Sequence, residues 1–389
     1  TGDADAGYAA DEITEILGKH KSDNGFTLNA NTKTVSAGGK ETLNKNGENI
    51  AMTFDWKTDG EATVVLRSVP VVRLSADKVE LVGEKKSLAL NPAGEYNTLE
   101  VRLVDDRLFV TSNGKSLAAN AVLKVAAGVA KAPVAGAMEL VANKGNIDLR
   151  NTNVCNLPET PVYTLSAEEK KAGFEVLFDG RSLDNWQGNT TGYTPDNGTI
   201  YVTANYGGSG NLYTKKKYSD FVYRFEFRYE TPGVNNGVGI RTNIGSDAAY
   251  DGMEIQILDH DDPIYAGLQP YQQHGSVYGI CVPKHVKFKL NTWNTEEIRA
   301  VGDRITVTVN GEVITDCNIR EACKGHNVAP DGGKHNPYTV DHKNHPGLFN
   351  KDGYVSFCGH GSGVRFRNIR ILDLGKNAKK TVKKTTKRK

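Results

Sequence analysis

The stretch Met253–Asp259 carries the side chains best suited to chemistry. With the two-residue period of a β-strand, the aliphatic residues at 253, 255 and 257 share one face, and Glu254 and Gln256 share the other. We expect the aliphatic face to be buried and the polar face to bind a polar ligand. Asp259 has the wrong parity to join that face unless a bulge or the end of the strand redirects it.

Arg241 is predicted to lie next to Glu254 on a neighbouring strand. Gly237, Gly239 and Arg241 have the spacing of one strand face, and the two glycines would leave room for a sugar against the sheet. A carboxylate beside a guanidinium stays ionised, which suits a base, a metal ligand or an acceptor for hydroxyl groups. The alternative is a structural Arg–Glu pair on an exposed sheet face.

Two histidines and two aromatic residues complete the predicted site. His274 and His360 each lie beside glycine, where the backbone can approach a ligand and an imidazole can exchange protons near neutral pH. Each could also be a turn histidine without a chemical role. Tyr278 and Trp293 could stack on a sugar ring or fill the sheet. A divalent metal held by Glu254, His274 and His360 is a further option that no ligand spacing identifies, and no other cofactor is expected.

The composition indicates a soluble, mainly β protein with about two domains. The chain has 389 residues, of which 38% are hydrophobic and 24% charged, and it contains no apolar run of the roughly 20 residues needed to span a membrane. The tail at 376–389 contains eight basic residues and no acid. We interpret it as a disordered, solvated end and expect no nucleic-acid partner.

Export is expected from the start of the sequence. It begins at Thr1 in a stretch of small and acidic residues, which we interpret as the product of signal-peptide removal. The expected location is therefore the periplasm, the cell surface or the medium. Five cysteines show no metal-site spacing, and Cys317 and Cys323 are close enough in sequence to pair, although sequence alone leaves the pairing open.

The sequence repeats itself. Residues 95–114 align without a gap with 292–311, residues 136–157 align with 353–374, and Arg67 falls on Arg241. This pattern predicts a duplicated all-β domain whose first copy is degenerate. The polar motif around Glu254 has only a loose counterpart, Lys78–Val82, in the first copy, and the loop 260–285 and the insertion 316–345 are absent from it. His360 aligns with Asn143, and Trp293 aligns with Tyr96.

We predict four segments. Residues 1–157 form a degenerate β-sandwich with a short helix at 11–19, 158–173 form a linker, 174–375 form the second sandwich, and 376–389 form the tail. Ser166 and Glu169 have the spacing of a capping box, which predicts a short helix within the linker.

The second copy, from about 165 to 374, resembles the 3-keto-disaccharide hydrolase domain family. The motifs that carry the resemblance are LFDGRSLDNW (177–186), NGVGIR (236–241), EIQILD (254–259), HGSVY (274–278), WN (293–294), VNG (309–311), GHG (359–361) and FRNI (366–369). The resemblance implies a concanavalin A-like jelly roll, a carbohydrate substrate and export. It therefore predicts two tandem jelly-roll sandwiches.

The implied activity is cleavage of 3-keto-glycosides. A ketone at C3 acidifies the hydrogen at C2, so that a base can remove it and the aglycone can leave from C1 by elimination, followed by addition of water. Glu254 or His360 is predicted as the base, with His274 as the partner acid or a metal ligand. Arg241, Gln256 and Asp259 are predicted to hold hydroxyl groups.

Two other functions stay open from the sequence. A conventional glycoside hydrolase needs two carboxylates about 5–5.5 Å apart for retention, and Glu254 and Asp259 offer that pair only loosely. A non-catalytic glycan-binding protein is the second alternative, because tandem modules add avidity.

Overall fold

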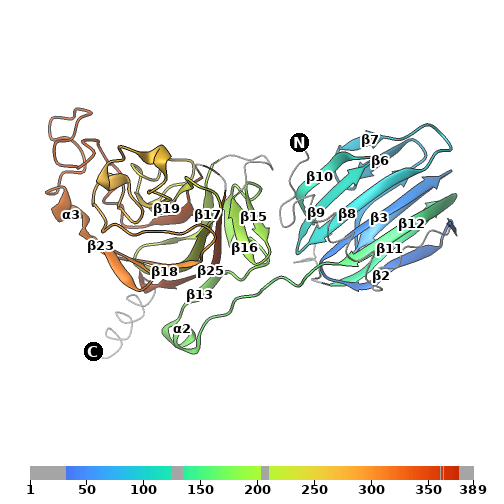
Figure 1. The fold of residues 1–389 in the computed structure, drawn as a ribbon, viewed down its shortest axis with the longest axis horizontal. Coiled ribbons are helices and arrows are strands. Elements are labelled where there is room, and N and C mark those ends of the chain that lie inside the picture. The colour runs from blue at the N-terminus through green and yellow to red at the C-terminus, as the bar shows by residue number, and fades with distance from the viewer. Residues whose placement is uncertain are drawn as a thin grey trace, which may run out of the picture. The chain divides into compact units, whose positions relative to one another are not determined.

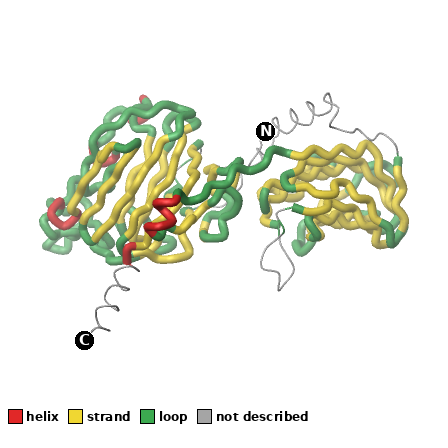
Figure 2. Tube along the Cα trace, turned by 90° about the horizontal axis from the view of Figure 1, so that it is seen from below, coloured by secondary structure: helices red, strands yellow, loops and turns green. Residues whose placement is uncertain are grey.

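The structure is a computed structural model that describes residues 32–123, 133, 135–202, 210–359, 361 and 363–375. The predicted helix at 11–19, the basic tail and His360 lie outside the described residues. The chain divides into two compact units, Thr1–Pro161 (unit 1) and Val162–Lys389 (unit 2), and the predicted linker spans this division. Strands hold 52% of the residues and helices 6%, which confirms the all-β prediction (Figure 2).

Unit 1 is a sandwich of two antiparallel six-stranded sheets. One has the order β1 (Lys33–Ser36), β12 (Asn146–Asn156), β3 (Ile50–Thr58), β8 (Asn97–Val104), β9 (Arg107–Ser112), β10 (Lys115–Val122). The other has the order β2 (Lys40–Gly47), β11 (Gly136–Lys144), β4 (Glu61–Leu66), β5 (Val69–Ser75), β6 (Lys78–Leu81), β7 (Ser87–Ala89). Alternate residues of both sheets fill one apolar core between them.

Unit 2 pairs an eight-stranded sheet with a five-stranded one (Figure 1). The larger sheet has the order β15 (Tyr193–Asp196), β16 (Thr199–Val202), β25 (Val364–Asp373), β18 (Phe221–Tyr229), β21 (Asn294–Val301), β22 (Arg304–Val309), β23 (Glu312–Asn318), and β13 (Glu175–Phe178) also pairs with β25. The smaller has the order β14 (Trp186–Gly188), β17 (Leu212–Tyr218), β24 (Gly353–Phe357), β19 (Asn235–Thr242), β20 (Met253–Leu258).

The strand orders of the two units correspond. The order β12-β3-β8-β9-β10 of unit 1 matches β25-β18-β21-β22-β23 of unit 2, and β2-β11-β4-β5 matches β17-β24-β19-β20. This is the pattern that a duplication leaves, and the common origin stays a prediction. One expectation needs correction, because β5 rather than the Lys78–Leu81 strand holds the place of β20 next to its neighbour.

Short helices occur only at connections in the described part of unit 2 (Figure 1). These are α2 (Ala167–Ala172), η2 (Pro263–Tyr265), η3 (Pro270–Gln272) and α3 (Ile319–Ala322). The predicted capping box is confirmed at α2, where Ser166 accepts the backbone N–H of Glu169 and the Glu169 side chain bonds back to Ser166. No helix among the described residues is long and apolar enough to cross a membrane.

A disulfide closes the loop that follows β20. It joins Cys281 to Cys317 at the end of β23, with Cα atoms 6.3 Å apart, and Cys323 is a free, buried thiol. The Cys317–Cys323 pairing that the sequence left open is therefore not formed. The bridge ties the segment beside β20 to the other sheet, so that the loop between them is fixed at both ends.

Candidate active site

The face of β20 that carries Glu254 is the outer face of the smaller sheet. Met253, Ile255 and Ile257 are fully buried in the core of unit 2, as their parity predicts. Glu254 and Gln256 are on the opposite face, each 6% exposed. The amide of Gln256 makes no hydrogen bond to another described residue, so it is available to a ligand.

Two glycines of β19 lie directly across from these polar residues. Gly237 pairs with Gln256 and Gly239 with Glu254, and we call this pair the glycine floor. A Cβ atom on Gly237 would lie only 2.1 Å from Glu254 Oε1. The carboxylate therefore lies against bare backbone, which is possible only because no side chain occupies that position.

Tyr278 continues the sheet beside Glu254. Its N–H donates to Glu254 O (2.9 Å), and the preceding residue, Val277, bridges Ile255 and is fully buried in the core. By alternation, the Tyr278 side chain lies on the same outer face as Glu254. Its hydroxyl accepts a hydrogen bond from Gln272 Nε2 (3.1 Å), which supports its predicted place at the site.

β24 and Cys358, which follows it, lie along the other side of the glycine floor. Ser356 pairs with Gly239, and Cys358 donates its N–H to Gly237 O (2.8 Å). Burial, followed by the nearby charge of Glu254, raises the pKa of the Cys358 thiol well above its usual value. A thiol in that state is a poor nucleophile, so covalent cysteine catalysis does not fit the site.

Arg241 does not lie beside Glu254, which corrects the prediction. The ladder between β19 and β24 shifts register after Gly239, and Arg241 has a φ of 49°. Its buried guanidinium donates to Ser219 O (2.8 Å) and Gly302 O (2.7 Å), in two turns of the larger sheet. Burial lowers the pKa of Arg241, and Asp220 opposes this shift at 3.1 Å.

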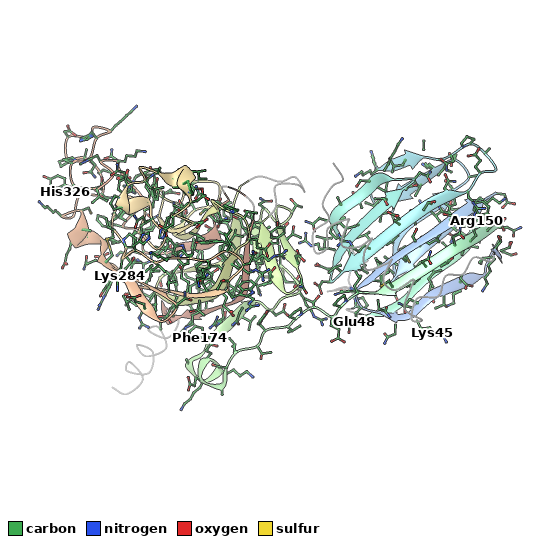
Figure 3. All side chains as sticks on the ribbon, in the orientation of Figure 1. Lys45, Glu48, Arg150, Phe174, Lys284 and His326 are labelled. Atoms are coloured by element: carbon green, nitrogen blue, oxygen red, sulfur yellow. A yellow bond between two sulfur atoms is a disulfide. The ribbon has the colours of Figure 1, made fainter. Side chains whose placement is uncertain are left out.

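Unit 1 contains the same arginine in the same role. Arg67 has a φ of 50°, and its guanidinium donates to the carbonyls of Glu48 and Asp105, in the turns that correspond to those at Ser219 and Gly302. Glu48 is labelled in Figure 3. An interaction that both units make cannot depend on the polar site of one, so we assign Arg241 to the fold.

Trp293 is also a structural residue. Its ring lies between two cations of the larger sheet, with Arg228 at 4.9 Å and Arg367 at 3.7 Å from its centroid. In unit 1 the aligned Tyr96 lies between Lys57 (4.8 Å) and Arg150 (3.8 Å), the latter labelled in Figure 3. Both guanidinium groups pack on the ring, as two cations pack on Tyr96 in unit 1, so the expectation that Trp293 stacks on a sugar is not supported.

Asp259 is bound to its own chain. Its Oδ2 accepts the N–H of Gly233 (2.9 Å), and its own N–H donates to Val234 O (2.9 Å). These bonds hold the start of β19 against the end of β20. Asp259 therefore closes the end of the β19–β20 pair, and its predicted role as a hydroxyl acceptor is not supported.

His274 lies inside the sandwich, on the side of β20 away from Glu254. It is fully buried, and its ring packs on Phe227 with centroids 5.0 Å apart. Nδ1 accepts the N–H of Leu258 (3.2 Å) and lies 2.7 Å from the Tyr229 hydroxyl, and Nε2 lies 2.6 Å from Glu296 Oε1. Since Nδ1 is an acceptor, the ring proton is on Nε2 and is donated to Glu296.

Glu296 is the residue that the sequence analysis missed. Its side chain is completely buried, and its second oxygen has no hydrogen-bond partner in the described part of the chain. It shares a strand face with the core residues Ile298 and Ala300, and it aligns with Leu99 of unit 1. The sequence therefore already showed an acid at one of the buried, alternate positions of this strand.

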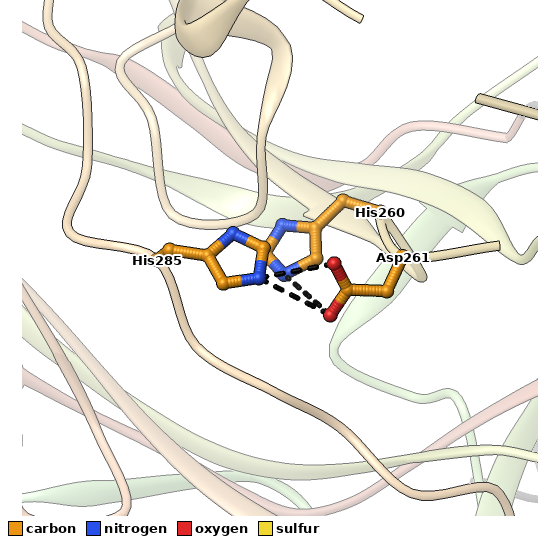
Figure 4. Close-up of side chains that lie close together, drawn as sticks. All are labelled: His260, Asp261 and His285. Carbon is orange, nitrogen blue, oxygen red and sulfur yellow. Dashed lines mark hydrogen bonds and ion pairs between the residues drawn. The ribbon is translucent and has the colours of Figure 1, made fainter. Parts of the chain in front are cut away.

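One group of described residues could gather metal ligands, and it does not fit a metal. His260, Asp261 and His285 have ligand atoms within 4.8 Å of one another (Figure 4). Both ring nitrogens of His260 are already used, because Nδ1 accepts the N–H of His274 (3.1 Å) and Nε2 donates to Val286 O. The predicted metal set does not fit either, since Glu254 and His274 are on opposite faces of β20.

The comparisons with known proteins concern unit 2. The chain is 23% identical over 230 residues to the 3-keto-disaccharide hydrolase of Bacteroides thetaiotaomicron. This match covers 51% of this chain and 78% of that protein. Two solved structures from Parabacteroides distasonis, each described as a "putative glycosyl hydrolase", share 24% and 23% identity. The two matches cover 51% and 54% of this chain and 98% of each solved chain, and each has a TM-score of 0.43.

The family model that matches is that of the 3-keto-alpha-glucoside-1,2-lyase-like domain, over residues 173–372. The match includes both sides of the glycine floor, Glu254, Gln256 and Tyr278. The chain therefore belongs to the 3-keto-alpha-glucoside-1,2-lyase-like domain family.

Proposed function

We propose that the protein is an exported enzyme that cleaves the glycosidic bonds of 3-keto-glycosides, with Glu254 as the base. The observation that carries this proposal is the Glu254 carboxylate lying on the glycine floor, next to the free amide of Gln256. The Glu254 side chain itself lies over Gly237, and Ser356 and Ala248 lie over Gly239, so a sugar ring must approach the carboxylate from outside these side chains. The disulfide Cys281–Cys317 supports export, because disulfides persist in oxidising compartments.

The reaction begins with removal of the C2 proton by Glu254. The electron pair of the C2–H bond forms an enediolate with the C3 carbonyl, and the negative charge resides on the C3 oxygen. Collapse of the enediolate forms a C1–C2 double bond as the C1–O bond breaks, and the aglycone oxygen takes up a proton. Addition of water across the double bond then yields the free 3-keto sugar.

The enediolate needs a hydrogen-bond donor, and with Arg241 bound elsewhere we assign this role to the pair Lys343–Tyr250. Lys343 Nζ donates to the Tyr250 hydroxyl (3.3 Å). Burial raises the pKa of Tyr250, so the phenol keeps its proton at neutral pH. Because its oxygen accepts from the ammonium group, the phenolic hydrogen is left to bind a substrate oxygen.

A buried pair holds this donor in place. Asp341 and His345, both in the segment predicted to be an insertion, are 2.8 Å apart, and His345 Nδ1 lies 2.7 Å from Ala249 O, beside Tyr250. The His345 ring lies 4.9 Å from the Tyr250 ring. Gly279, directly after Tyr278, has a φ of 75° and passes so close to Asp341 that a Cβ atom would lie 2.3 Å from Oδ2. The insertion, Tyr250 and the Tyr278 segment thus form one packed wall.

His360 stays in the proposal as an alternative base or as the acid for the leaving group. It follows Cys358, whose N–H donates to Gly237 O, by two residues in the sequence. The departing oxygen needs a proton. Because His274 is buried in the core, we assign this step to His360, the other histidine of the predicted site.

Steady-state turnover of 4-nitrophenyl 3-keto-α-glucoside tests the proposal. We expect wild-type protein to release nitrophenol from this substrate and not from the unoxidised glucoside, and Glu254→Gln to lower kcat about 10²–10⁴-fold. Tyr250→Phe is expected to lower kcat about 10²-fold. Glu312→Gln, which removes a carboxylate exposed on the other sheet, is the matched control and should retain full activity.

A glycan-binding protein would give a different result. Wild-type protein would then bind the keto-glucoside without releasing nitrophenol, and Glu254→Gln would change only the dissociation constant. Equal turnover of the unoxidised glucoside would instead select a conventional glycoside hydrolase.

A further inference from the structure

Unit 1 contains a pocket at the place where unit 2 is filled by its own loop. Trp56 in β3 pairs with Asn97, and its counterpart Phe227 in β18 pairs with Asn294. In unit 2 the loop after β20 covers Phe227 with the rings of His274 (5.0 Å) and Phe288 (5.6 Å). In unit 1 the strand that corresponds to β20 is followed at once by the turn into β6, so no loop of that length follows it, and other described residues bury Trp56.

The space left open is a pocket of about 510 Å³. Trp56, Asn97, Asp59 and Asp148 are among its lining residues. Its volume falls in the range of about 300–1,000 Å³ that is typical of small-molecule sites. The whole pocket lies within unit 1.

Trp56 has an unsatisfied polar atom in this pocket's lining. Its side chain is fully buried, and the indole Nε1–H has no hydrogen-bond acceptor among the described residues. Buried N–H groups without acceptors are rare because their desolvation is not offset. By contrast, the buried Trp186 of unit 2 donates its indole N–H to Leu177 O (2.9 Å).

Asn97 presents a second donor. Its Oδ1 accepts the N–H of Asn91 (2.8 Å) and the Nδ2 of Asn113 (2.9 Å), which fixes the orientation of the amide. Its own Nδ2 donates to no described residue, whereas the same atom of Asn294 in unit 2 donates to Thr292 O (3.0 Å). Unit 1 therefore has a buried indole donor without an acceptor and an amide donor that bonds to no described residue, whereas the amide of Asn294 in unit 2 is used internally.

The pocket also contains carboxylates, which define the ligand class. Asp59 and Asp148 lie in its lining, and Lys57 is held over the ring of Tyr96 at 4.8 Å. A ligand must accept hydrogen bonds from the indole and the amide and avoid negative charge near three acids, since Glu95 also lines the pocket. Sugar hydroxyl groups both accept and donate, so they can bond to the donors and to the carboxylates of this lining.

We infer that unit 1 is a glycan-binding module whose pocket takes an uncharged sugar ring, with Trp56 and Asn97 as donors. The inference does not depend on the activity of unit 2. It gives the first half of the chain a function that differs from that of the second, although the two have the same strand order.

Indole N–H signals in the full-length protein test this inference. The chain has three tryptophans, so ¹⁵N-labelled protein gives three indole signals, and the Trp56→Phe variant assigns one of them. Phenylalanine is the residue that unit 2 has at this position, so the variant is expected to fold. The probe is maltose, titrated to 50 mM in the Glu254→Gln background, which prevents turnover.

We expect the Trp56 signal to shift saturably with maltose while the signal of Trp186 stays fixed. Asn97→Ala and Asp148→Ala should each raise the apparent dissociation constant at least fivefold, and Asp77→Ala, outside the pocket, should leave it unchanged. No shift of the Trp56 signal at 50 mM, or a shift that is linear and the same in Asp148→Ala, would overturn the inference. Failure of unit 2 to cleave keto-glucosides would leave this result unaffected.

Discussion

Units 1 and 2 have the same strand order and differ in what lies on and between the sheets. Arg67 and Arg241 make the same bonds to corresponding turns, and Tyr96 and Trp293 are each held between two cations. On the outer face of the smaller sheet, Thr63 and Val65 of unit 1 occupy the positions of Gly237 and Gly239. A polar residue present in both units therefore serves the fold, and one present only in unit 2 is a candidate for function.

The largest expected effect comes from the buried pair Glu296–His274, which replaces an apolar contact at Leu99. Glu296→Leu leaves the buried Nε2–H of His274 without its acceptor, and we expect a loss of about 1–3 kcal/mol in the free energy of unfolding of unit 2. The double variant Glu296→Leu/His274→Leu should recover most of that loss. Urea unfolding of wild type and the two variants measures the loss and its recovery, and a double variant as unstable as the single one would contradict this account.

The glycine floor gives the second effect. In Gly237→Thr, which introduces the residue of unit 1, the new Cβ atom would displace the Glu254 carboxylate from its place. We expect about a 100-fold loss in kcat/KM on the keto-glucoside, with little change in the urea midpoint, because the displaced group is the end of a flexible side chain. The mirror change, Thr63→Gly, should leave activity intact. Full activity in Gly237→Thr would show that the floor is not part of the site.

A smaller effect is expected from His260, which unit 1 lacks. Burial lowers the pKa of His260 below its unfolded value, so the unfolded chain binds more protons in the range between the two pKa values. The stability that the neutral ring contributes is therefore present above pH 6.5 and is lost as the pH falls below it. The melting temperature of unit 2, measured from pH 7.5 to 5.5, should fall less in His260→Phe than in wild type. Equal slopes would assign the pH dependence to other groups.

The smallest effect is expected for Trp293→Tyr. Tyrosine is the residue that unit 1 places between the corresponding cations, so we expect less than about 0.5 kcal/mol of destabilisation and unchanged KM. A several-fold rise in KM would return Trp293 to the substrate site.

The sequence predicted those parts of the site that follow from strand alternation. The parity of β20 placed Glu254 and Gln256 together, and the glycine spacing placed the floor across from them. Arg241 could not be placed, because a positive φ after a register shift reverses the direction that alternation assigns to the side chain. The glycine next to His274 gave no information on which side of the strand the ring would lie.

Two other residues could have been interpreted correctly from the repeat itself. Trp293 aligns with Tyr96, and one of the cations that pack on each ring aligns as well, Arg367 with Arg150. Glu296 aligns with Leu99 in a strand whose other inward positions are apolar. The pair Lys343–Tyr250, to which we assign the donor role, could not be predicted from the sequence, since it joins residues 93 positions apart in irregular loops.

The fate of the C2 hydrogen tests the role of Glu254 most directly. With a 3-keto-glucoside deuterated at C2, we expect wild-type protein to release deuterium to solvent in step with the aglycone, as followed by NMR, and Glu254→Gln to release neither. Aglycone release with deuterium retained at C2, or unchanged deuterium loss in Glu254→Gln, would contradict the assignment of Glu254 as the base.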